Sequence, residues 1–175
     1  MKFAYENELV INHSKSKVIL FNKAHKFDFL PKVKLVENKY LEVVEEVRLL
    51  GVAVSSNLKW HAHVADVCKR AHAKLWLIRR LINLNATTEI LLDLYYKQVR
   101  SLMEYAAPLW SPGLTESDKE ELERLQKSAF SIIFKSESKS YSRLLSKLNL
   151  KSLDQKRLDI CQKFANNSEN HQIFS

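Results

Sequence analysis

The chain has 175 residues, of which 46% are hydrophobic and 27% charged, a balance typical of folded globular proteins rather than of disordered chains. Its net charge of +8 favours a polyanionic partner such as nucleic acid, although simply solvated surfaces reach similar charges. Two cysteines are too few for a disulfide framework, and 2 glycines with 3 prolines disfavour turn-rich all-β folds and glycine-rich phosphate loops.

The N-terminal segment MKFAYENELV carries Glu6 and Glu8 at positions where a signal peptide has an apolar core. No segment approaches the roughly 20 apolar residues that span a bilayer. We therefore expect a soluble intracellular protein, in the cytoplasm or the nucleus, that has no membrane partner.

The N-terminal third favours β-strands. Short β-branched runs at 8–12 and 17–21 flank a polar turn, and residues 32–36 alternate with period two. The run at 47–54, VRLLGVAV, is almost continuously apolar, which predicts a buried strand with Gly51 at a bend or a close approach. These runs predict a small antiparallel sheet.

After residue 57 the apolar period becomes helical. The clearest helix is expected to bury one stripe, made of Val64, Val67, Cys68, Ala71, Leu75, Ile78 and Ile82. A second helix is expected at about 87–107, ended by Pro108 and the Ser-Pro-Gly at 111–113. Its candidate buried side comprises Leu91, Leu94, Tyr95, Leu102 and Tyr105.

Further helices follow toward the C-terminus. Ser117 and Glu120 form the pattern of a capping box before an apolar face of Leu122, Leu125, Ala129, Ile132 and Ile133. A short helix is expected near 141–148, and Ser152 is expected to cap a last helix that ends near Asn166.

The predicted fold class is α+β. A small antiparallel β-sheet or hairpin at residues 1–56 precedes a mainly α-helical bundle of about five helices at residues 57–175. We find neither an internal repeat nor a low-complexity linker.

Basic side chains concentrate in two windows. The interval between Asp66 and Glu89 has no acidic residue and contains Lys69, Arg70, Lys74, Arg79 and Arg80. In the second window, basic residues recur four apart, at Lys139, Arg143, Lys147 and Lys151. Like charges stacked on a helix repel one another, so phosphates would explain the pattern better than a solvated face, which stays the alternative. Trp60, Trp76 and Tyr141 could stack on bases, although such aromatic side chains more often belong to a core.

No catalytic constellation is evident. Polymerases that use two divalent metals need clustered carboxylates, whereas Glu45-Glu46 and Glu120-Glu121 fit a solvated strand end and the first turn of a helix. His61, Cys68 and His72 project to one side of the predicted helix, but they span too many turns to share one zinc ion. We therefore expect no bound metal and no cofactor.

An ordered series of short motifs covers nearly the whole chain. It begins with Phe3, Asn7, Leu9 to Asn12, and Lys15-Ser16-Lys17, and continues with Leu50-Gly51-Val52, Leu58, Trp60 and His63. Its later members are Val99, Arg100, Ser101, Glu104, Tyr105, Pro108, Trp110, Leu122, Glu123, Gln126 and Ala129. The series resembles the region just after the catalytic palm in reverse transcriptases of non-LTR retrotransposons, the jockey-like and related LINE elements. Phe3 and Ser16 replace a tryptophan and a threonine of that family.

The resemblance implies a role for each region. Lys15 would correspond to a lysine near the incoming nucleotide, and Leu50-Gly51-Val52 to the hairpin that grips the primer end. The helices that follow would be the thumb and its C-terminal extension, which hold the primer–template duplex by its backbone. The family's fingers and its Mg-binding catalytic aspartates would lie upstream of Met1, so we expect no polymerase activity from this chain.

The sequence therefore predicts a truncated, inactive part of an RNA-directed DNA polymerase that retains affinity for an RNA/DNA primer–template. The expected nucleic-acid-binding residues are Lys15, Lys17, Leu50, Gly51, Val52, Trp60, Lys69, Arg70, Lys74, Arg79, Arg80, Lys139, Arg143, Lys147 and Lys151. The alternatives are a helical protein-interaction scaffold and a relic without function, followed at a distance by a metal-dependent enzyme. A surface that faces the palm in the family would be exposed here, which predicts self-association.

Overall fold

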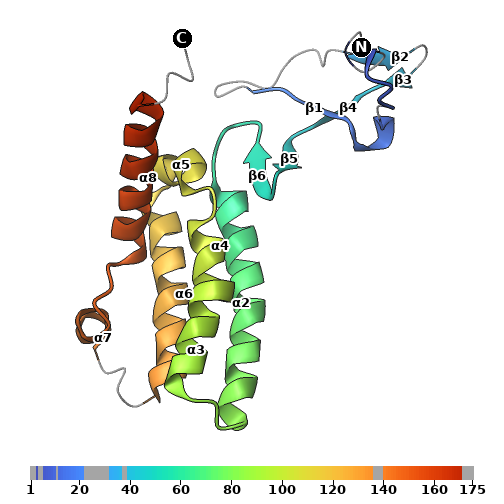
Figure 1. Ribbon diagram of the computed structural model, residues 1–175. Coiled ribbons are helices and arrows are strands. Elements are labelled where there is room, and N and C mark those ends of the chain that lie inside the picture. Colours follow the sequence, from blue (N-terminus) through green and yellow to red (C-terminus); the bar gives the residue numbers. More distant parts are fainter. Residues whose placement is uncertain are drawn as a thin grey trace. The chain divides into compact units, whose positions relative to one another are not determined.

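The computed structural model describes residues 3, 6–10, 12–21, 32–36, 39–135 and 140–170. The chain is α+β and mainly helical, as predicted (Figure 1). It divides into two compact units, the first ending at Lys59 and the second beginning at Trp60. The boundary predicted between residues 56 and 57 lies close to this division.

The first unit contains short strand pairs and the 3₁₀ turn η1 (His13–Lys15). The strands are β1 (Lys17–Ile19), β2 (Lys34–Val36), β3 (Lys39–Tyr40), β4 (Glu42–Val44), β5 (Glu46–Leu49) and β6 (Val52–Ser55). The β2–β3 and β5–β6 pairs are antiparallel, as expected, but β1 pairs with β4 in parallel. The intervening chain, which includes β2 and β3, lets β4 return in the same direction as β1.

The strand predicted at 8–12 is wrong where the structure describes it. Glu8 has a φ of 53°, and the Val10 side chain is 96% exposed, so no other described residue covers Val10. Ile11 lies outside the described residues. The predictions at 17–21 and 32–36 hold in part, because β1 and β2 lie within those runs.

The run at 47–54 forms a hairpin and not one buried strand. Leu49 pairs with Val52, which leaves Leu50 and Gly51 as a two-residue turn between β5 and β6. Both turn residues have positive φ, 47° at Leu50 and 86° at Gly51, which matches the handedness that two-residue hairpin turns require. Gly51 adopts this conformation at little cost, whereas Leu50 is strained there.

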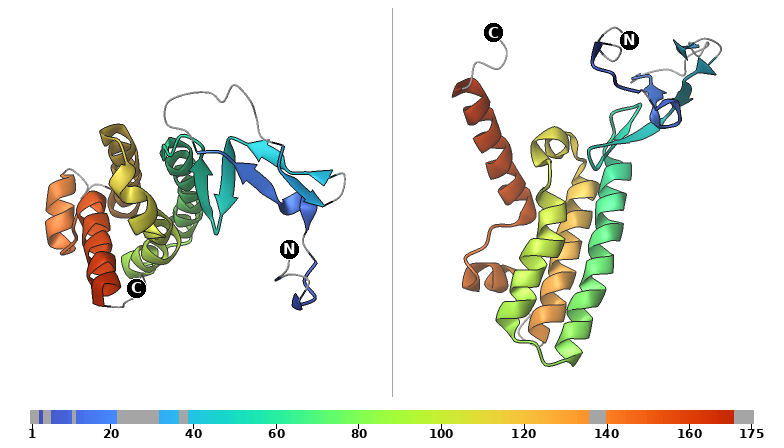
Figure 2. Two further views of the ribbon diagram at one scale, coloured as in Figure 1. Left: turned by 90° about the horizontal axis from the view of Figure 1, so that it is seen from above. Right: turned by 45° about the vertical axis from the view of Figure 1, so that its right-hand side comes forward.

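The second unit is helical (Figures 1 and 2). Its elements are α2 (His61–Asn83), α3 (Thr88–Leu94), η2 (Tyr95–Arg100), α4 (Ser101–Glu104), α5 (Ala107–Trp110), η3 (Ser111–Gly113), α6 (Glu116–Phe134), α7 (Tyr141–Lys147) and α8 (Leu153–Asn170). The helix that runs through α3, η2 and α4 lies beside α2 and α6, and these three rods enclose the core (Figure 1). Helix α8 packs against α5 and α6.

The buried stripe predicted for α2 is confirmed, except that Ile82 is only half-buried. In the rod formed by α3, η2 and α4, every fourth residue from Leu91 to Met103 is buried. A spacing of four residues drifts around a regular helix of 3.6 residues per turn. The wider π-helical turn of η2 accommodates that spacing and also turns Arg100 inward. Tyr105, predicted to be buried, is 55% exposed.

The helix ends differ in detail from the predictions. Ala106, with a φ of 52°, ends α4, and Pro108 lies in the first turn of α5 instead of terminating a helix. The capping box of α6 is formed by Thr115 and Asp118 and not by Ser117 and Glu120. Ser152 Oγ accepts from the Gln155 amide at 3.3 Å, as predicted, and α8 continues beyond Asn166 to Asn170.

Candidate nucleic-acid interface

The solvent-facing side of α2 carries the first basic window. Lys69, Lys74, Arg79 and Arg80 are exposed, and Arg70 is half-buried. Each residue turns by about 100° around the helix axis, so Lys69, Trp76 and Arg80 project from α2 within about 40° of one another. Ala73 is exposed on the same stripe. Lys69, Ala73, Trp76 and Arg80 are called the α2 stripe below.

Trp76 and Arg80 interact on the surface of α2. The Trp76 side chain is 57% exposed, and the Arg80 guanidinium carbon lies 5.3 Å from the centroid of its ring. A cation held over an exposed indole in this way combines a phosphate ligand with a surface for stacking. Helical periodicity places Trp76 opposite the buried stripe, and the spacing of four residues from Trp76 to Arg80 is the signal that could have paired them.

Some of the predicted cations have acidic partners among the residues that the structure describes. Arg70 Nε lies 2.9 Å from Asp66 Oδ2, and the Lys17 ammonium is paired with Glu42 across β1 and β4. Lys151 Nζ donates to Asp159 Oδ2 at 2.6 Å. A phosphate would have to compete with these carboxylates, so these cations contribute less than Lys69 and Arg80, for which no acidic partner is found in the described part of the chain.

The second basic window does not form one helical stripe. Arg143 and Lys147 lie one turn apart on α7 and are exposed. The helix ends before Asn149, which has a φ of 51°, so Lys151 lies in the connection to α8. Lys139 lies outside the described residues.

The remaining predicted contacts in the first unit lie on η1 and at the β5–β6 turn. Lys15 is exposed at the end of η1. Leu50 is 84% exposed at the tip of the hairpin, next to the half-buried Gly51, whereas Val52 is only 2% exposed. Leu50 is therefore at the surface, while Val52 is buried.

Trp60 has a packing role. Its ring lies 6.4 Å from that of His63, which in turn lies 5.1 Å from the ring of Trp110, both edge-on. The indole also covers Gly113, where an added Cβ would meet Trp60 Nε1 at 2.6 Å. Trp110 is fully buried, and its Nε1 donates to the Tyr105 carbonyl at 2.8 Å. The prediction that Trp60 binds nucleic acid therefore has little support from this geometry.

Arg157 completes this cluster and was not singled out from the sequence. Its side chain is fully buried, and its guanidinium carbon lies 5.8 Å from the Trp110 ring centroid. Burial lowers the pKa of Arg157, opposed by Asp154, whose Oδ1 lies 3.6 Å from Nη2. No hydrogen-bond partner is found for its guanidinium among the described residues.

A chain of buried polar side chains joins η2, α6, α7 and the start of α8. Tyr95 donates to Gln126 Oε1 at 2.6 Å, and Gln126 Nε2 donates to the Tyr141 hydroxyl at 2.6 Å. Tyr141 donates to Glu123, whose second oxygen accepts from the Leu153 amide at 3.0 Å. Burial raises the pKa of both tyrosines, with Glu123 adding to the effect on Tyr141, so both remain neutral donors.

His61, Cys68 and His72, the side chains considered above as zinc ligands, have different neighbours in the structure. His72 Nδ1 lies 2.8 Å from the Cys68 carbonyl, and burial, followed by Glu121, raises the Cys68 pKa to about 12. His61 Nδ1 instead lies 2.9 Å from Asp118 Oδ1. Within the described ranges, no three His, Cys, Asp or Glu side chains converge as metal ligands.

In comparisons with known proteins, no family model, curated protein or solved structure matched this chain. Among the described helices, none has the length and apolar character required to cross a bilayer. The chemistry of the exposed side chains is thus the main guide to function.

Proposed function

We propose that this chain binds a nucleic-acid duplex through the α2 stripe and belongs to the post-palm region of a non-LTR reverse transcriptase. The observation that carries the binding proposal is the exposed Trp76–Arg80 pair, which shares one stripe with Lys69 and with no acidic side chain. The function proposed is binding without catalysis.

The stripe suits the backbone of a duplex. Lys69 and Arg80 are about 16 Å apart along the helix axis, because each residue rises by about 1.5 Å. Ala73 lies between them and leaves room for close approach. Two cations spaced in this way neutralise phosphates without reading sequence, which is how a duplex is held in register.

The residues that carry the family resemblance mostly have structural roles. Trp60, His63 and Trp110 pack together, Glu123 joins Tyr141 to Leu153, and Gln126 is fully buried. They support the proposal indirectly, because they pack α2 against α5 and tie α6 to η2, α7 and the start of α8, which holds the helical unit together.

The test is binding of the chain to a fluorescently labelled RNA–DNA primer–template at low salt, followed by anisotropy. We expect saturable binding that weakens about tenfold in the double variant Lys69→Ala/Arg80→Ala. The matched control, Arg124→Ala/Lys163→Ala, removes two exposed charges that have no ion pair among the described residues and should keep most of the affinity. Equal loss in both variants would show that net charge, and not the α2 stripe, drives binding.

A second candidate function is association with another protein. Leu109 on α5 and Leu158 on α8 are 58% and 49% exposed, and these two helices pack against each other. Apolar association is largely insensitive to salt, whereas phosphate binding weakens steeply with it. Sedimentation at low and high salt separates the two, because a self-associating chain stays oligomeric at both.

A further inference from the structure

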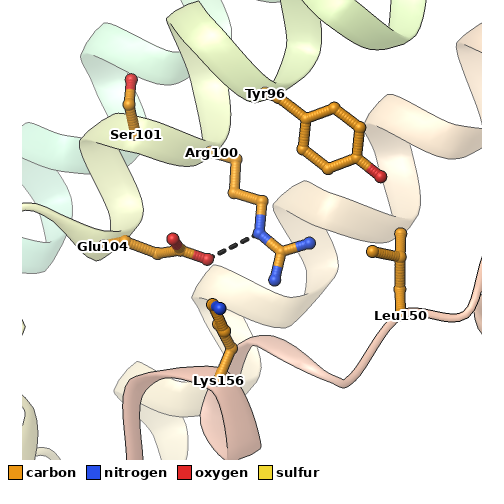
Figure 3. A pocket seen from close by; sticks show the side chains of 6 residues that line it. All are labelled: Tyr96, Arg100, Ser101, Glu104, Leu150 and Lys156. Atoms are coloured by element: carbon orange, nitrogen blue, oxygen red, sulfur yellow. Dashed lines mark hydrogen bonds and ion pairs between the residues drawn. The ribbon is translucent and has the colours of Figure 1, made fainter. Parts of the chain in front are cut away.

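A pocket of about 370 Å³ lies between η2–α4 and the start of α8. It is lined by Tyr96, Arg100, Ser101, Glu104, Leu150 and Lys156. Figure 3 shows Arg100, Glu104 and Lys156 pointing toward one another from two different helices. Its volume falls in the range of small-molecule sites.

Two cations in this pocket have hydrogen-bonding capacity to spare. Arg100, whose side chain is only 7% exposed, donates from Nε to Glu104 Oε1 at 2.6 Å. This bond uses Nε, and no hydrogen bond of the two Nη groups is found within the described ranges, which leaves them for a ligand. Lys156 is half-buried, and no hydrogen bond or ion pair of its ammonium is found among the described residues.

The polar balance of the pocket favours a negative ligand. Glu104 is the one carboxylate in the lining, and Arg100 already engages it. Ser101 Oγ donates to the Lys97 carbonyl at 2.6 Å, so its hydroxyl hydrogen is also committed. The remaining donors in the lining are the Tyr96 hydroxyl and those of the two cations, and paired cations of this kind bind carboxylates and phosphates.

The pocket also has an apolar wall. The Arg100 guanidinium carbon lies 5.7 Å from the centroid of the Tyr96 ring, and Leu150 lines the pocket from the α7–α8 connection. Figure 3 shows Tyr96 and Leu150 on the same side of Arg100. A ligand whose charged head meets the two cations can therefore rest an aromatic or aliphatic body on these side chains.

We propose that this pocket binds a small organic oxyanion, a phosphate monoester or a carboxylate attached to an apolar group. The head pairs with Arg100 Nη and Lys156 Nζ, and the apolar part packs on Tyr96 and Leu150. This site is separate from the α2 stripe and does not depend on duplex binding.

The test uses the full chain, with phenyl phosphate and benzoate as probes and phenol as the uncharged comparison. Amide shifts in NMR spectra are followed through titration at constant ionic strength. We expect saturable shifts at Leu150 and Lys156 with one or both anions at millimolar concentrations, and none with phenol. The stronger of the two anions identifies the head group that the pocket prefers.

Variants decide whether the pocket is responsible. Lys156→Ala removes a side chain that has no hydrogen bond to another described residue, and it should weaken binding at least tenfold in a folded protein, whereas Lys163→Ala on the same helix should not. Arg100→Lys keeps the charge but loses the paired Nη donors, and it should also weaken binding. Unchanged affinity in Lys156→Ala, equal binding of phenol, or no saturable shift with either anion would overturn the proposal.

Discussion

Replacing Arg80 by alanine is expected to reduce the salt dependence of duplex binding, whereas replacing its neighbour Arg79 is not. At about 100° per residue, Arg80 lies about 20° from Lys69, but Arg79 lies about 80° away on the other side. A duplex along the α2 stripe therefore reaches Lys69 and Arg80 together and leaves Arg79 in solvent. The two variants lose the same charge, so net charge cannot account for a difference between them.

The magnitude follows from counting phosphate contacts. Each contact contributes about 0.9 to the slope of log affinity against log salt concentration, so two contacts give about 1.8. A fourfold rise in salt then weakens the parent chain about 12-fold, and Arg80→Ala, with one contact left, only about 3.5-fold. Removing Arg80 also exposes the face of Trp76 that its guanidinium covers.

The assay is anisotropy of a labelled primer–template at several KCl concentrations, with the slope fitted for each variant. Circular dichroism checks that both variants keep the helical content of the parent chain. Equal slopes for Arg79→Ala and Arg80→Ala, or a parent slope near zero, would refute the assignment of phosphate contacts to the α2 stripe.

Three further predictions concern stability. Gly113→Ala should lower the free energy of unfolding in urea by about 2 kcal/mol, because the new Cβ would clash with the Trp60 indole. A decrease no larger than that caused by an alanine substitution at an exposed position would contradict this. Leu50→Asn should stabilise the hairpin by about 1 kcal/mol, since asparagine tolerates the positive φ, and a lower thermal midpoint would count against it. The third prediction concerns the pH dependence of unfolding. The hydrogen bond to Asp118 raises the pKa of His61 above its ordinary 6.5. The stabilisation from protonated His61 is therefore fully present below pH 6.5 and is lost as the pH rises through the pKa of His61 in the folded protein. Burial alone would raise the Asp118 pKa, but hydrogen bonds from Thr115 and His61 hold it below 3.8, so its contribution is present above 3.8 and lost on acidification through the folded pKa. His61→Gln should abolish the alkaline part of the profile, and an unchanged pH dependence of unfolding would exclude the pair as its source.

The helical half of the fold could be predicted from the sequence, because the spacing of apolar residues within each helix is a local pattern. The stripe from Val64 to Ile78 repeats with the helical period, and the same period identifies the exposed side that carries Lys69 and Arg80. The hairpin was not accessible in this way. Apart from Arg48, the run from Val47 to Val54 is apolar, so only the backbone angles at Leu50 and Gly51 separate two strands from one.

Other errors arose where distant residues decide the outcome. Thr115-x-x-Asp118 and Ser117-x-x-Glu120 are overlapping capping patterns, and sequence does not rank them. The structure uses the first, in which Asp118 is also held by His61, 57 positions away. Long-range ion pairs could not be predicted either. Lys17, for example, is paired with Glu42 because β1 and β4 place these two residues opposite each other.

The buried polar chain from Tyr95 to Leu153 has a consequence for hydrogen exchange. It provides polar links from the core rods to α7 and to the first turn of α8, ending in the hydrogen bond from the Leu153 amide to Glu123. If α7 and α8 detach as one cooperative unit while the core rods stay closed, the Leu153 amide exchanges with solvent sooner than the amides of α2. The exchange rate of that single amide would then measure how often the C-terminal helices open.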